Sequence, residues 1–295
     1  MRFLFSTGSL YTYGTARCFE FSARAGFDGV EVMVDDRWDT RQPAYLLELE
    51  QRYSMPILAV HSPFTPSVPG WPDGDVERLT RCIALAEALG AAVVAHHLPL
   101  RSGLAWVQIL GERMPLPLPW HDPAGGYRRW LEGMYLIAQA GTPVALCIEN
   151  MPARQALGAR WNAHEWNTLE EIGRFGAITL DTTHLGTWSQ DPLTVYAALA
   201  GKVRHVHLSN YDGREHRLPQ HGPLALDQLL ARMAADNYAH AVTLELSPDA
   251  LRAGEDDETV LDELRGALDH CRLWAQRPPD QGAQHRNGGG DDHAT

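Results

Sequence analysis

The stretch "AITLDTTHLG", Ala177 to Gly186, begins as a buried strand and then runs into a carboxylate and an imidazole. Ala177 to Leu180 is a short apolar run of the kind that forms an interior strand. Asp181 follows it directly, and His184 lies three residues further on. An unpaired buried carboxylate costs several kcal/mol or takes up a proton. The stretch therefore predicts that both polar side chains meet partners from elsewhere in the chain.

Seven other apolar runs of similar length occur along the chain, with amphipathic segments between them. The eight runs are "RFLFSTG" from Arg2, "GVEVMV" from Gly29, "ILAVH" from Ile57, "AAVVAHH" from Ala91, "VALCIE" from Val144, "AITLD" from Ala177, "VRHVHL" from Val203 and "AVTLEL" from Ala241. Strands that are apolar on both faces and alternate with helices are typical of a parallel sheet. Eight such units predict an α/β fold, a single (β/α)8 TIM barrel over residues 1–274.

The segments between the runs carry residues that start and stop helices. Asp75 and Asp191 are predicted to cap helix N-termini, and Gly90 and Gly201 to end the same two helices. The competing architecture is a doubly wound open sheet. It is disfavoured because no G-x-G-x-x-G follows any of the runs.

Two connections and the C-terminal end do not follow the strand and helix pattern. The connections Ser62 to Gly74 and Leu98 to Gly125 are long enough to act as a lid, a binding loop or an oligomer contact. Their aromatic residues are expected to shape the substrate pocket, and the loops could form a homodimer contact. These residues are Phe64, Trp71, Trp106 and Trp120. Residues 275–295, which lack aromatic and large aliphatic residues from Pro278 on, are predicted to be a disordered tail.

Composition disfavours several classes of protein. With 25 basic and 37 acidic residues the net charge is -12, and a nucleic-acid backbone binder needs a concentrated basic face. The cysteines Cys18, Cys82, Cys147 and Cys271 are scattered, which indicates buried thiols in a cytoplasmic protein. The N-terminus lacks a signal-peptide core, and no run reaches the roughly 18 apolar residues of a membrane span. We therefore expect no membrane association.

Polar residues with metal-binding side chains recur where the predicted strands end, and in a barrel these ends form one ring that holds the active site. They are His61, His96, His97, Glu149, Asp181, His184, His205, His207 and Glu245. Glu149, Asp181, His207 and Glu245 are each separated by about one βα unit. This oxygen-rich set suits Mn²⁺, Mg²⁺ or Co²⁺.

Further histidines extend the candidate site. His61, His97, His184 and His216 could bind a second ion or a substrate oxygen, and so many imidazoles favour Zn²⁺. Against this stands the common structural use of a single histidine. His96 and His205 are expected to be structural or to support the ligands, because neighbouring strand residues point to opposite faces and a deeper residue rarely reaches the mouth of the barrel. Glu149 taken alone could be an ion-pair partner of Arg154.

In these residues the chain resembles the xylose-isomerase-like barrel superfamily, which groups sugar phosphate isomerases and epimerases with family 2 apurinic endonucleases. The similar pieces, in order, are "GFDGVEVM", "AVHSPF", "GAAVVAHHLP", "CIENMP", "TLDTTHLG", "RHVHLSN" and "TLELSP". In the isomerase branch the resemblance implies Glu149, Asp181, His207 and Glu245 as metal ligands, with the two glutamates also as the acid and base. It further implies that His184 holds a substrate oxygen. Arg214 or Arg217 would contact the far end of the substrate.

The endonuclease branch implies further ligands near His61, His97, His184, Asp212 and His216. The match weakens after the seventh run, because "YDGREHRLPQHGPL" is shorter than the endonuclease pattern and lacks its aspartate-x-histidine pair. A looser His-x-x-Pro-x-x-Gly pattern from His216 to Gly222 is present.

The sequence thus predicts a metal-dependent isomerase or epimerase that acts on a sugar, a sugar phosphate or a polyol ketone. The reaction would remove a proton next to a carbonyl, with a divalent cation stabilising the developing charge. Three alternatives stay open at this point: a Zn²⁺-dependent phosphodiesterase, a dehydratase of the same superfamily, and a barrel that binds without turnover. The expected partner is a small sugar-like molecule and not nucleic acid.

Overall fold

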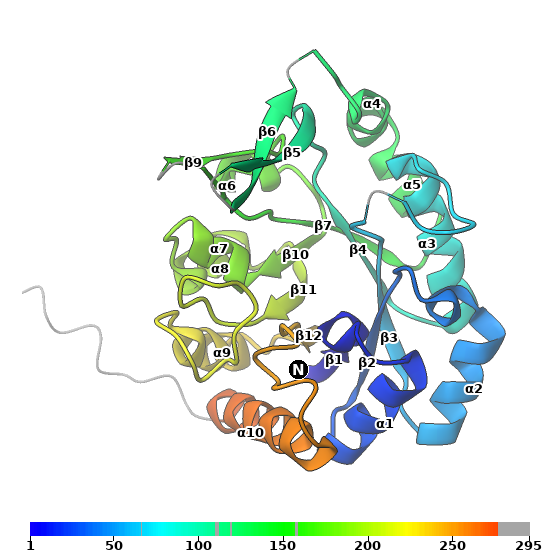
Figure 1. Cartoon of the computed structure of the whole chain (residues 1–295), viewed down its shortest axis with the longest axis vertical. Helices are drawn as coiled ribbons and strands as arrows, with labels where there is room; N and C mark the ends of the chain where they lie inside the picture. The colour runs from blue at the N-terminus through cyan, green and yellow to red at the C-terminus, as the bar shows by residue number, and fades with distance from the viewer. Residues whose placement is uncertain (66, 110–111, 119, 157–158, 277–295) are drawn as a thin grey trace, which may run out of the picture.

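Eight parallel strands close into a barrel in the computed structural model, which describes residues 1–65, 67–109, 112–118, 120–156 and 159–276 (Figure 1). The strands are β1 (Arg2–Ser6), β2 (Gly29–Met33), β3 (Ile57–His61), β4 (Val93–His97), β7 (Ala145–Glu149), β10 (Ile178–Asp181), β11 (Val203–Leu208) and β12 (Ala241–Leu244). Around the barrel their order is β1-β12-β11-β10-β7-β4-β3-β2. The eight predicted strands and the (β/α)8 TIM barrel are confirmed.

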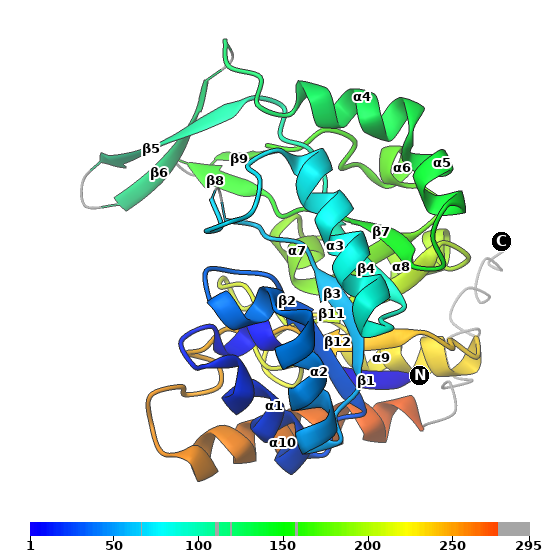
Figure 2. The same cartoon turned by 90° about the vertical axis from the view of Figure 1, so that its right-hand side faces the viewer.

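Helices surround this barrel (Figures 1 and 2). The α-helices are α1 (Thr15–Ala25), α2 (Pro43–Tyr53), α3 (Asp75–Leu89), α4 (Gly125–Gly133), α5 (Tyr135–Ala140), α6 (Leu169–Ile172), α7 (Thr182–Thr187), α8 (Pro192–Leu199), α9 (Leu226–Ala235) and α10 (Asp257–Ala275). Two 3₁₀ turns, η1 (Thr7–Leu10) and η2 (Trp38–Arg41), follow β1 and β2. No helix of the described residues is both long and apolar enough to cross a bilayer.

Two of the four residues predicted to begin or end a helix take the predicted position in the structure. Asp191 caps α8 by accepting hydrogen bonds from the second and third helical N–H groups, and Gly90 ends α3 with a left-handed φ of 70°. Asp75, in contrast, is the first residue of α3 and Gly74 is its cap. Helix α8 ends at Leu199, and its C-cap is Ala200, one residue before the predicted Gly201. A carboxylate in the first turn still interacts favourably with the helix dipole, so Asp75 suits either position.

The inside of the barrel changes from apolar to polar toward the carboxyl ends of the strands. A separate apolar cluster fills one part of it and comprises Leu4, Ala59, Val93, Cys147, Ala177 and Ala241. Residues two apart on a strand share a face. Thus Cys147 is followed on its face by Glu149, and Ala177 by Thr179 and Asp181. The larger apolar cluster lies between the strands and the helices, so the polar side chains occupy the only part of the described barrel that this packing leaves for them.

The long connection from Leu98 to Gly125 is not a bare loop. It contains an antiparallel hairpin of β5 (Gly103–Ile109) and β6 (Glu112–Leu118), which stands away from the barrel (Figure 2). Pro115 and Pro117 argue against a strand at the level of sequence, because proline normally interrupts the backbone hydrogen bonds of a sheet. Since they are two residues apart, both missing N–H groups face the same side of β6, the side away from β5. A second short hairpin, β8 (Arg154–Ala156) with β9 (Ala159–Trp161), lies beside it.

The aromatic residues of the long connections take different positions. Phe64 and Trp120 are exposed, whereas Trp71 packs against the core. The side chain of Trp106 and residues 277–295 lie outside the described residues, so the predicted pocket wall, homodimer contact and disordered tail stay predictions. The four cysteines are buried and unpaired, as their scattered spacing predicted.

Strand β10 passes directly into helix α7, without a loop between them. The side chain of Asp181 caps α7 by accepting a hydrogen bond from the N–H of His184 at 2.8 Å. Thr183 then donates from its hydroxyl to the backbone oxygen of Asn210, after β11. The stretch is therefore one rigid unit in which the cap spacing fixes where His184 lies relative to Asp181.

Gly186 allows this unit to approach the next connection. A Cβ atom on Gly186 would lie 2.7 Å from the Cβ of Tyr211. Replacing Gly186→Ala is expected to lower the free energy of unfolding by about 1–3 kcal/mol, because two packed segments must move apart. Chemical denaturation measures the change. Gly133→Ala at the end of α4, where a Cβ meets no atom within 4 Å, is the matched control and should not destabilise the protein. Equal stability of both variants would contradict the close packing of α7.

Candidate metal centre

Four side chains from four adjacent strand ends converge inside the barrel. One oxygen each of Glu149, Asp181 and Glu245 and one ring nitrogen of His207 lie within 4.8 Å of one another. The His207 Nδ1 atom is 2.9 Å from Glu245 Oε2, 3.3 Å from Glu149 Oε1 and 3.8 Å from Asp181 Oδ2. Glu149 and Asp181 end β7 and β10, His207 lies in β11, and Glu245 follows β12 directly. The structure thus brings together the four residues that the sequence set apart as ligands.

Asp181 keeps one oxygen without a donor. Its Oδ1 caps α7, while the buried Oδ2 has no hydrogen-bond partner. Asn150 fixes the backbone on both sides of it, since its amide accepts from Asp181 N at 2.8 Å and donates to Asp181 O at 3.0 Å. A buried carboxylate oxygen without a donor is costly unless a cation or a proton binds it. The orphaned oxygen points to a cation among these four side chains.

Burial and the surrounding charges shift the pKa values of the three carboxyl groups in different directions. Burial, followed by the charges of Glu149 and Glu245, raises the pKa of Asp181 well above its usual value. Burial also opposes ionisation of Glu245 and Glu149, but the charge on His207 outweighs it. The pKa of Glu245 falls to about 2, and that of Glu149 falls well below its usual value. Without a cation the site therefore holds two carboxylates against one imidazolium, and the third carboxyl group keeps its proton.

His207 is the positive group of the metal-free site. Burial opposes its protonation, but the charges of Glu31, Glu245 and Glu149 raise its pKa well above the usual value. A divalent cation could replace its proton and that of Asp181, because metal ligands must be deprotonated. Three carboxylates and one imidazole fit a hard or borderline divalent ion. The donor set, the burial and the orphaned oxygen all fit such an ion.

Two predicted histidines face the other oxygen of Glu149. His61 Nε2 is 3.1 Å and His97 Nε2 is 3.7 Å from Glu149 Oε2. His61 Nδ1 lies 2.6 Å from the backbone oxygen of Ser62, to which it must donate. Burial opposes protonation of His61, but its hydrogen bond to Glu149 raises its pKa. Burial lowers the pKa of His97 well below its usual value. Glu149 therefore stands between His207 on one oxygen and these two imidazoles on the other.

His184 and His216 lie on the other side of the four ligands, together with a residue that sequence reasoning missed. His184 Nδ1 is 2.8 Å from the backbone oxygen of Asn150 and 3.4 Å from Glu149 Oε1. Its Nε2 faces Glu215 at 3.9 Å, and potential ligand atoms of His184, Glu215 and His216 lie within 4.8 Å of one another. Burial lowers the pKa of His184. The neighbouring letters "EH" at 215 and 216 were the available signal for this cluster.

Asp212, Arg214 and Arg217 form a separate network of ion pairs. Arg217 lies 2.7 Å from Asp249 and 3.4 Å from Asp212, and Arg214 lies 3.3 Å from Asp249. Among the described residues Asp212 belongs to none of the clusters of potential metal ligands. Its role as a ligand and the substrate contact of either arginine stay predictions.

Glu31 is the second residue that sequence reasoning missed. It lies in β2, fully buried, with its carboxylate 2.6 Å from His205 Nε2 and 3.0 Å from His207 Nε2. Burial opposes its ionisation, but the charges of both histidines lower its pKa well below the usual value. His96, in contrast, contacts Ser62, and burial lowers its pKa to about 3. A glutamate in the middle of the apolar run "GVEVM" was the signal for Glu31.

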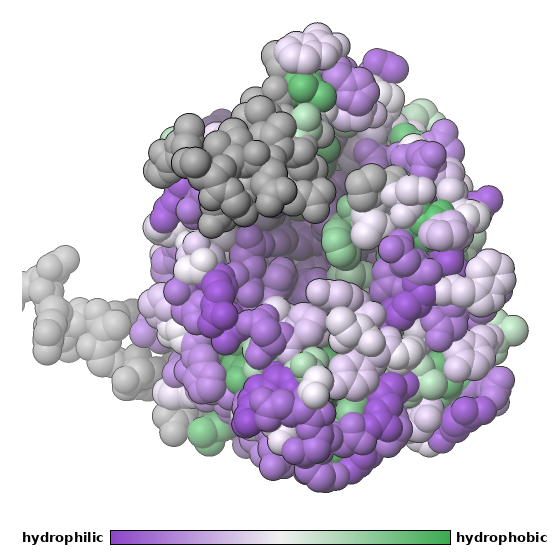
Figure 3. Space-filling view, in the orientation of Figure 1, coloured by the Kyte–Doolittle hydropathy of each residue, from purple (hydrophilic) through white to green (hydrophobic). Residues whose placement is uncertain are grey.

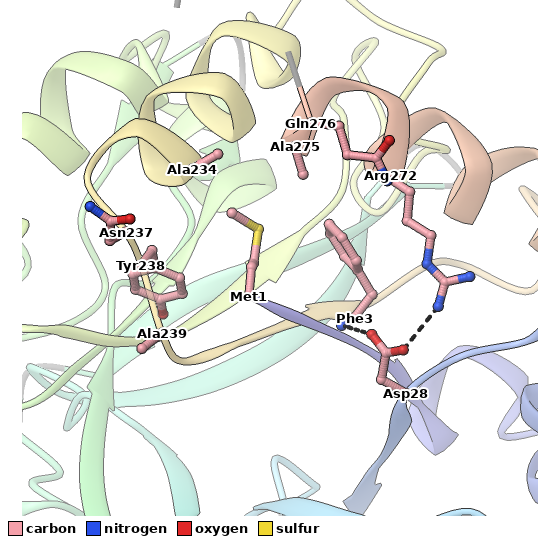
Figure 4. Close-up of a pocket in the computed structure, with 10 residues that line it drawn as sticks. All are labelled: Met1, Phe3, Asp28, Ala234, Asn237, Tyr238, Ala239, Arg272, Ala275 and Gln276. Carbon is pink, nitrogen blue, oxygen red and sulfur yellow. Dashed lines mark hydrogen bonds and ion pairs between the residues drawn. The ribbon is translucent and has the colours of Figure 1, made fainter. Parts of the chain in front are cut away.

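The four candidate ligands lie at the carboxyl ends of the barrel strands. The face of the molecule is hollowed at its centre over the barrel strands, and hydrophilic side chains line the hollow (Figure 3). A cavity of about 560 Å³ at the opposite end is lined by residues that include Met1, Phe3, Asp28 and Arg272 (Figure 4). Asp28 accepts from Phe3 N and pairs with Arg272 at 2.9 Å. No other charged side chain occurs among its described lining residues, so it shows no catalytic cluster.

Fold and site together define a (β/α)8 barrel whose strand ends carry a set of metal-ligand side chains. The chain belongs to the family described as xylose isomerase-like TIM barrel, whose sequence model matches residues 19–271. A relative from Mycobacterium leprae, an uncharacterized protein, is 27% identical over 300 residues, which cover 92% of this chain and 97% of the relative. The predicted family resemblance is thus confirmed.

Solved structures share the fold at low sequence identity. A D-tagatose 3-epimerase-like protein has a TM-score of 0.63 and 19% identity, with 93% of this chain and 98% of that chain covered. D-allulose 3-epimerase from Methylomonas sp., in complex with D-allulose, has a TM-score of 0.60 and 17% identity, with 92% of this chain and 96% of that chain covered. An AP endonuclease, family 2, from Brucella melitensis has a TM-score of 0.60 and 15% identity, with 84% of this chain and 93% of that chain covered. At these identities the similarity shows the fold.

Binding of Mn²⁺ to the metal-free protein is expected to release about one to two protons, because Asp181 and His207 must lose theirs to become ligands. Since both pKa values are raised, the affinity should increase as the pH rises. Calorimetric titration in buffers of different ionisation enthalpy counts the protons.

The variant Asp181→Asn is the control for this experiment. Its amide oxygen can still cap α7, but it has no proton to lose and no charge to offer the ion. It should release fewer protons and bind Mn²⁺ more weakly than the wild-type protein. Metal binding that is independent of pH in the wild-type protein would contradict the assigned ligand set.

Proposed function

We propose that this protein is a metal-dependent epimerase or isomerase of a ketose or a related sugar. The observation that carries the proposal is the position of two carboxylates. Glu149 on β7 and Glu245 after β12 flank the two strands that carry Asp181 and His207. A substrate bound over the centre would therefore lie between two carboxylates, one on each side. Epimerase structures with the same fold, one of them in complex with D-allulose, support a sugar as the substrate class.

The donor set favours Mn²⁺, Mg²⁺ or Co²⁺ as the ion, and the nearby imidazoles leave Zn²⁺ as an alternative. The chemistry that a bound divalent cation supplies is positive charge next to the substrate oxygen on which negative charge develops. Glu149, Asp181, His207 and Glu245 would hold the ion in this position.

The two glutamates would carry the proton transfers. Both have lowered pKa values in the metal-free protein, so both are ionised at neutral pH and either can accept a proton. One carboxylate removes the proton from the carbon next to the carbonyl, and the electron pair of that bond moves toward the carbonyl oxygen. The second glutamate, which must first take up a proton from solvent, gives it to the opposite face of the carbon in an epimerase; in an isomerase the proton goes to the adjacent carbon. Dehydration of a polyol ketone begins with the same abstraction.

His184 is suited to bind a hydroxyl group of the substrate. Its Nδ1–H is held by the backbone oxygen of Asn150, and its lowered pKa keeps the ring neutral. The Nε2 atom is then an acceptor that faces away from Asn150. A sugar hydroxyl is a donor that this atom can accept. Of the two arginines, Arg214 is more exposed than Arg217 and is the better candidate for a contact with the far end of the substrate.

A second candidate function, hydrolysis of a phosphodiester with more than one ion, is favoured by the histidines around Glu149. His61, Glu149 and His207 form one cluster of potential ligands, and His184, Glu215 and His216 form another. An AP endonuclease structure shares the fold. The net charge of -12 argues against a duplex substrate, since backbone binding requires a basic surface.

Replacing Glu149→Gln and Glu245→Gln singly should slow proton exchange of a ketose substrate in D₂O by about 10²–10⁴-fold, because each amide cannot transfer the proton. Nuclear magnetic resonance of a panel of ketoses with saturating Mn²⁺ measures the exchange before the product is known. Saturation separates the loss of proton transfer from the loss of a ligand.

The matched control is Glu255→Gln, an exposed glutamate paired with Arg252. Its exchange rate should equal that of the wild-type protein. Full exchange in both active-site variants would rule out the acid and base roles.

Duplex DNA with an abasic site should be neither retarded at moderate salt nor cleaved, since the acidic surface repels the phosphate backbone. Gel electrophoresis after incubation with Mn²⁺ or Zn²⁺ tests both outcomes. Cleavage that is lost in His61→Ala, together with more than one ion per chain by elemental analysis, would replace the first proposal with the second.

A further inference from the structure

The carboxylate of Glu31 lies beneath the candidate metal centre and is fully occupied by donors. Its Oε1 is 3.0 Å from His207 Nε2. Its Oε2 is 2.6 Å from His205 Nε2 and accepts from the hydroxyl of Thr243 at 2.7 Å. All four side chains are completely buried. A charged group placed so deep is retained only where its hydrogen bonds are complete, which is the case here.

The contact with His207 crosses the inside of the barrel. Glu31 lies on β2 and His207 on β11, and in the barrel order β1 and β12 separate these two strands. No backbone ladder therefore relates the two residues. Their approach comes from the side chains alone, both of which point inward.

Glu31 holds the nitrogen of His207 that faces away from the other carboxylates. A carboxylate accepts hydrogen bonds and cannot donate them, so the Nε2 atom of His207 must carry the hydrogen. The Nδ1 atom is then the one that points to Glu149, Asp181 and Glu245. In the neutral ring its lone pair is free for an ion.

The cluster of Glu31, His205 and His207 is not itself a second ion site. Both oxygens of Glu31 already accept hydrogen bonds, from His207 and from His205 and Thr243, and the contact of 2.6 Å with His205 is a hydrogen-bond distance. The cluster therefore supports a neighbouring site.

We propose that Glu31 is a positioning residue for the metal centre, which holds the Nε2–H of His207 and thereby presents Nδ1 to the ion. The inference rests on the metal-dependent function proposed above. It adds a residue that touches neither the ion nor the substrate and acts only through His207.

The test measures Mn²⁺ affinity by calorimetric titration of full-length, metal-free protein, in the absence of sugar. Glu31→Gln and Glu31→Leu should each weaken binding by about 10–100-fold, the usual effect of losing a partner of a metal-bound histidine. The loss in Glu31→Gln should be smaller, since the amide oxygen can still accept from Nε2–H. If Glu31→Leu does not fold, Glu31→Gln alone decides.

A spectroscopic measurement separates positioning from general support of the fold. With Mg²⁺ bound, the ¹⁵N shifts of His207 should show a protonated Nε2 in the wild-type protein and a mixture of ring forms in Glu31→Leu. Thr243→Val is the matched control, because it removes a hydrogen bond to the other oxygen of Glu31 and leaves the contact with His207 in place. It should lower stability but change Mn²⁺ affinity by less than about threefold.

Wild-type Mn²⁺ affinity in a folded Glu31→Gln variant, or an equal loss in Thr243→Val, would overturn the inference. Neither result bears on proton exchange, so the proposed function would stand. Conversely, weaker binding in the Glu31 variants without any sugar exchange in the wild-type protein would overturn the proposed function and leave this inference intact.

Discussion

Three carboxylates cannot all remain ionised within a few ångströms of one another in a buried space unless positive charge lies among them. Glu149, Asp181 and Glu245 are in this position, and His207 supplies the one positive group of the metal-free protein. The surrounding structure serves this arrangement. Asn150 fixes the backbone of Asp181 from both sides, the cap of α7 occupies one oxygen of Asp181, and Glu31 holds the far nitrogen of His207. All of these contacts hold groups that take part in the repulsion among the three carboxylates.

The strands and the ring of polar strand ends could be read from the sequence because two physical signals coincide there. Runs that are apolar on both faces indicate a buried parallel sheet, and barrel geometry then brings the polar ends together. Other features gave no such signal. The hairpin could not be predicted from the sequence, since the prolines of β6 normally argue against a strand. Glu31 was missed because a single charge within "GVEVM" identifies no partner, and its partners are His205 and His207, far away in the sequence.

Asp181 and His184 show why spacing alone left two interpretations open. A carboxylate three residues before a histidine suits a helix cap as well as a pair of ligands. In the structure one oxygen of Asp181 caps the helix, and the other is buried without a hydrogen-bond partner. His184 keeps its own backbone N–H in the cap and its ring toward the site. Glu149 is divided in the same way, with one oxygen toward His207 and the other toward His61 and His97. A barrel of this kind can thus offer places for further ions without changing the central four residues.

The tie between Glu31 and His207 also bears on the order of folding. The two residues are 176 positions apart, so the contact closes a very long loop and forms only after most of the chain has been made. In any structure formed by β1 to β4 alone, the Glu31 carboxylate would lack its imidazole partners. Burying it there would be costly, which disfavours a compact structure of these strands without the rest of the barrel. The same side chain that holds Nε2 of His207 in the complete protein would therefore disfavour an incomplete barrel.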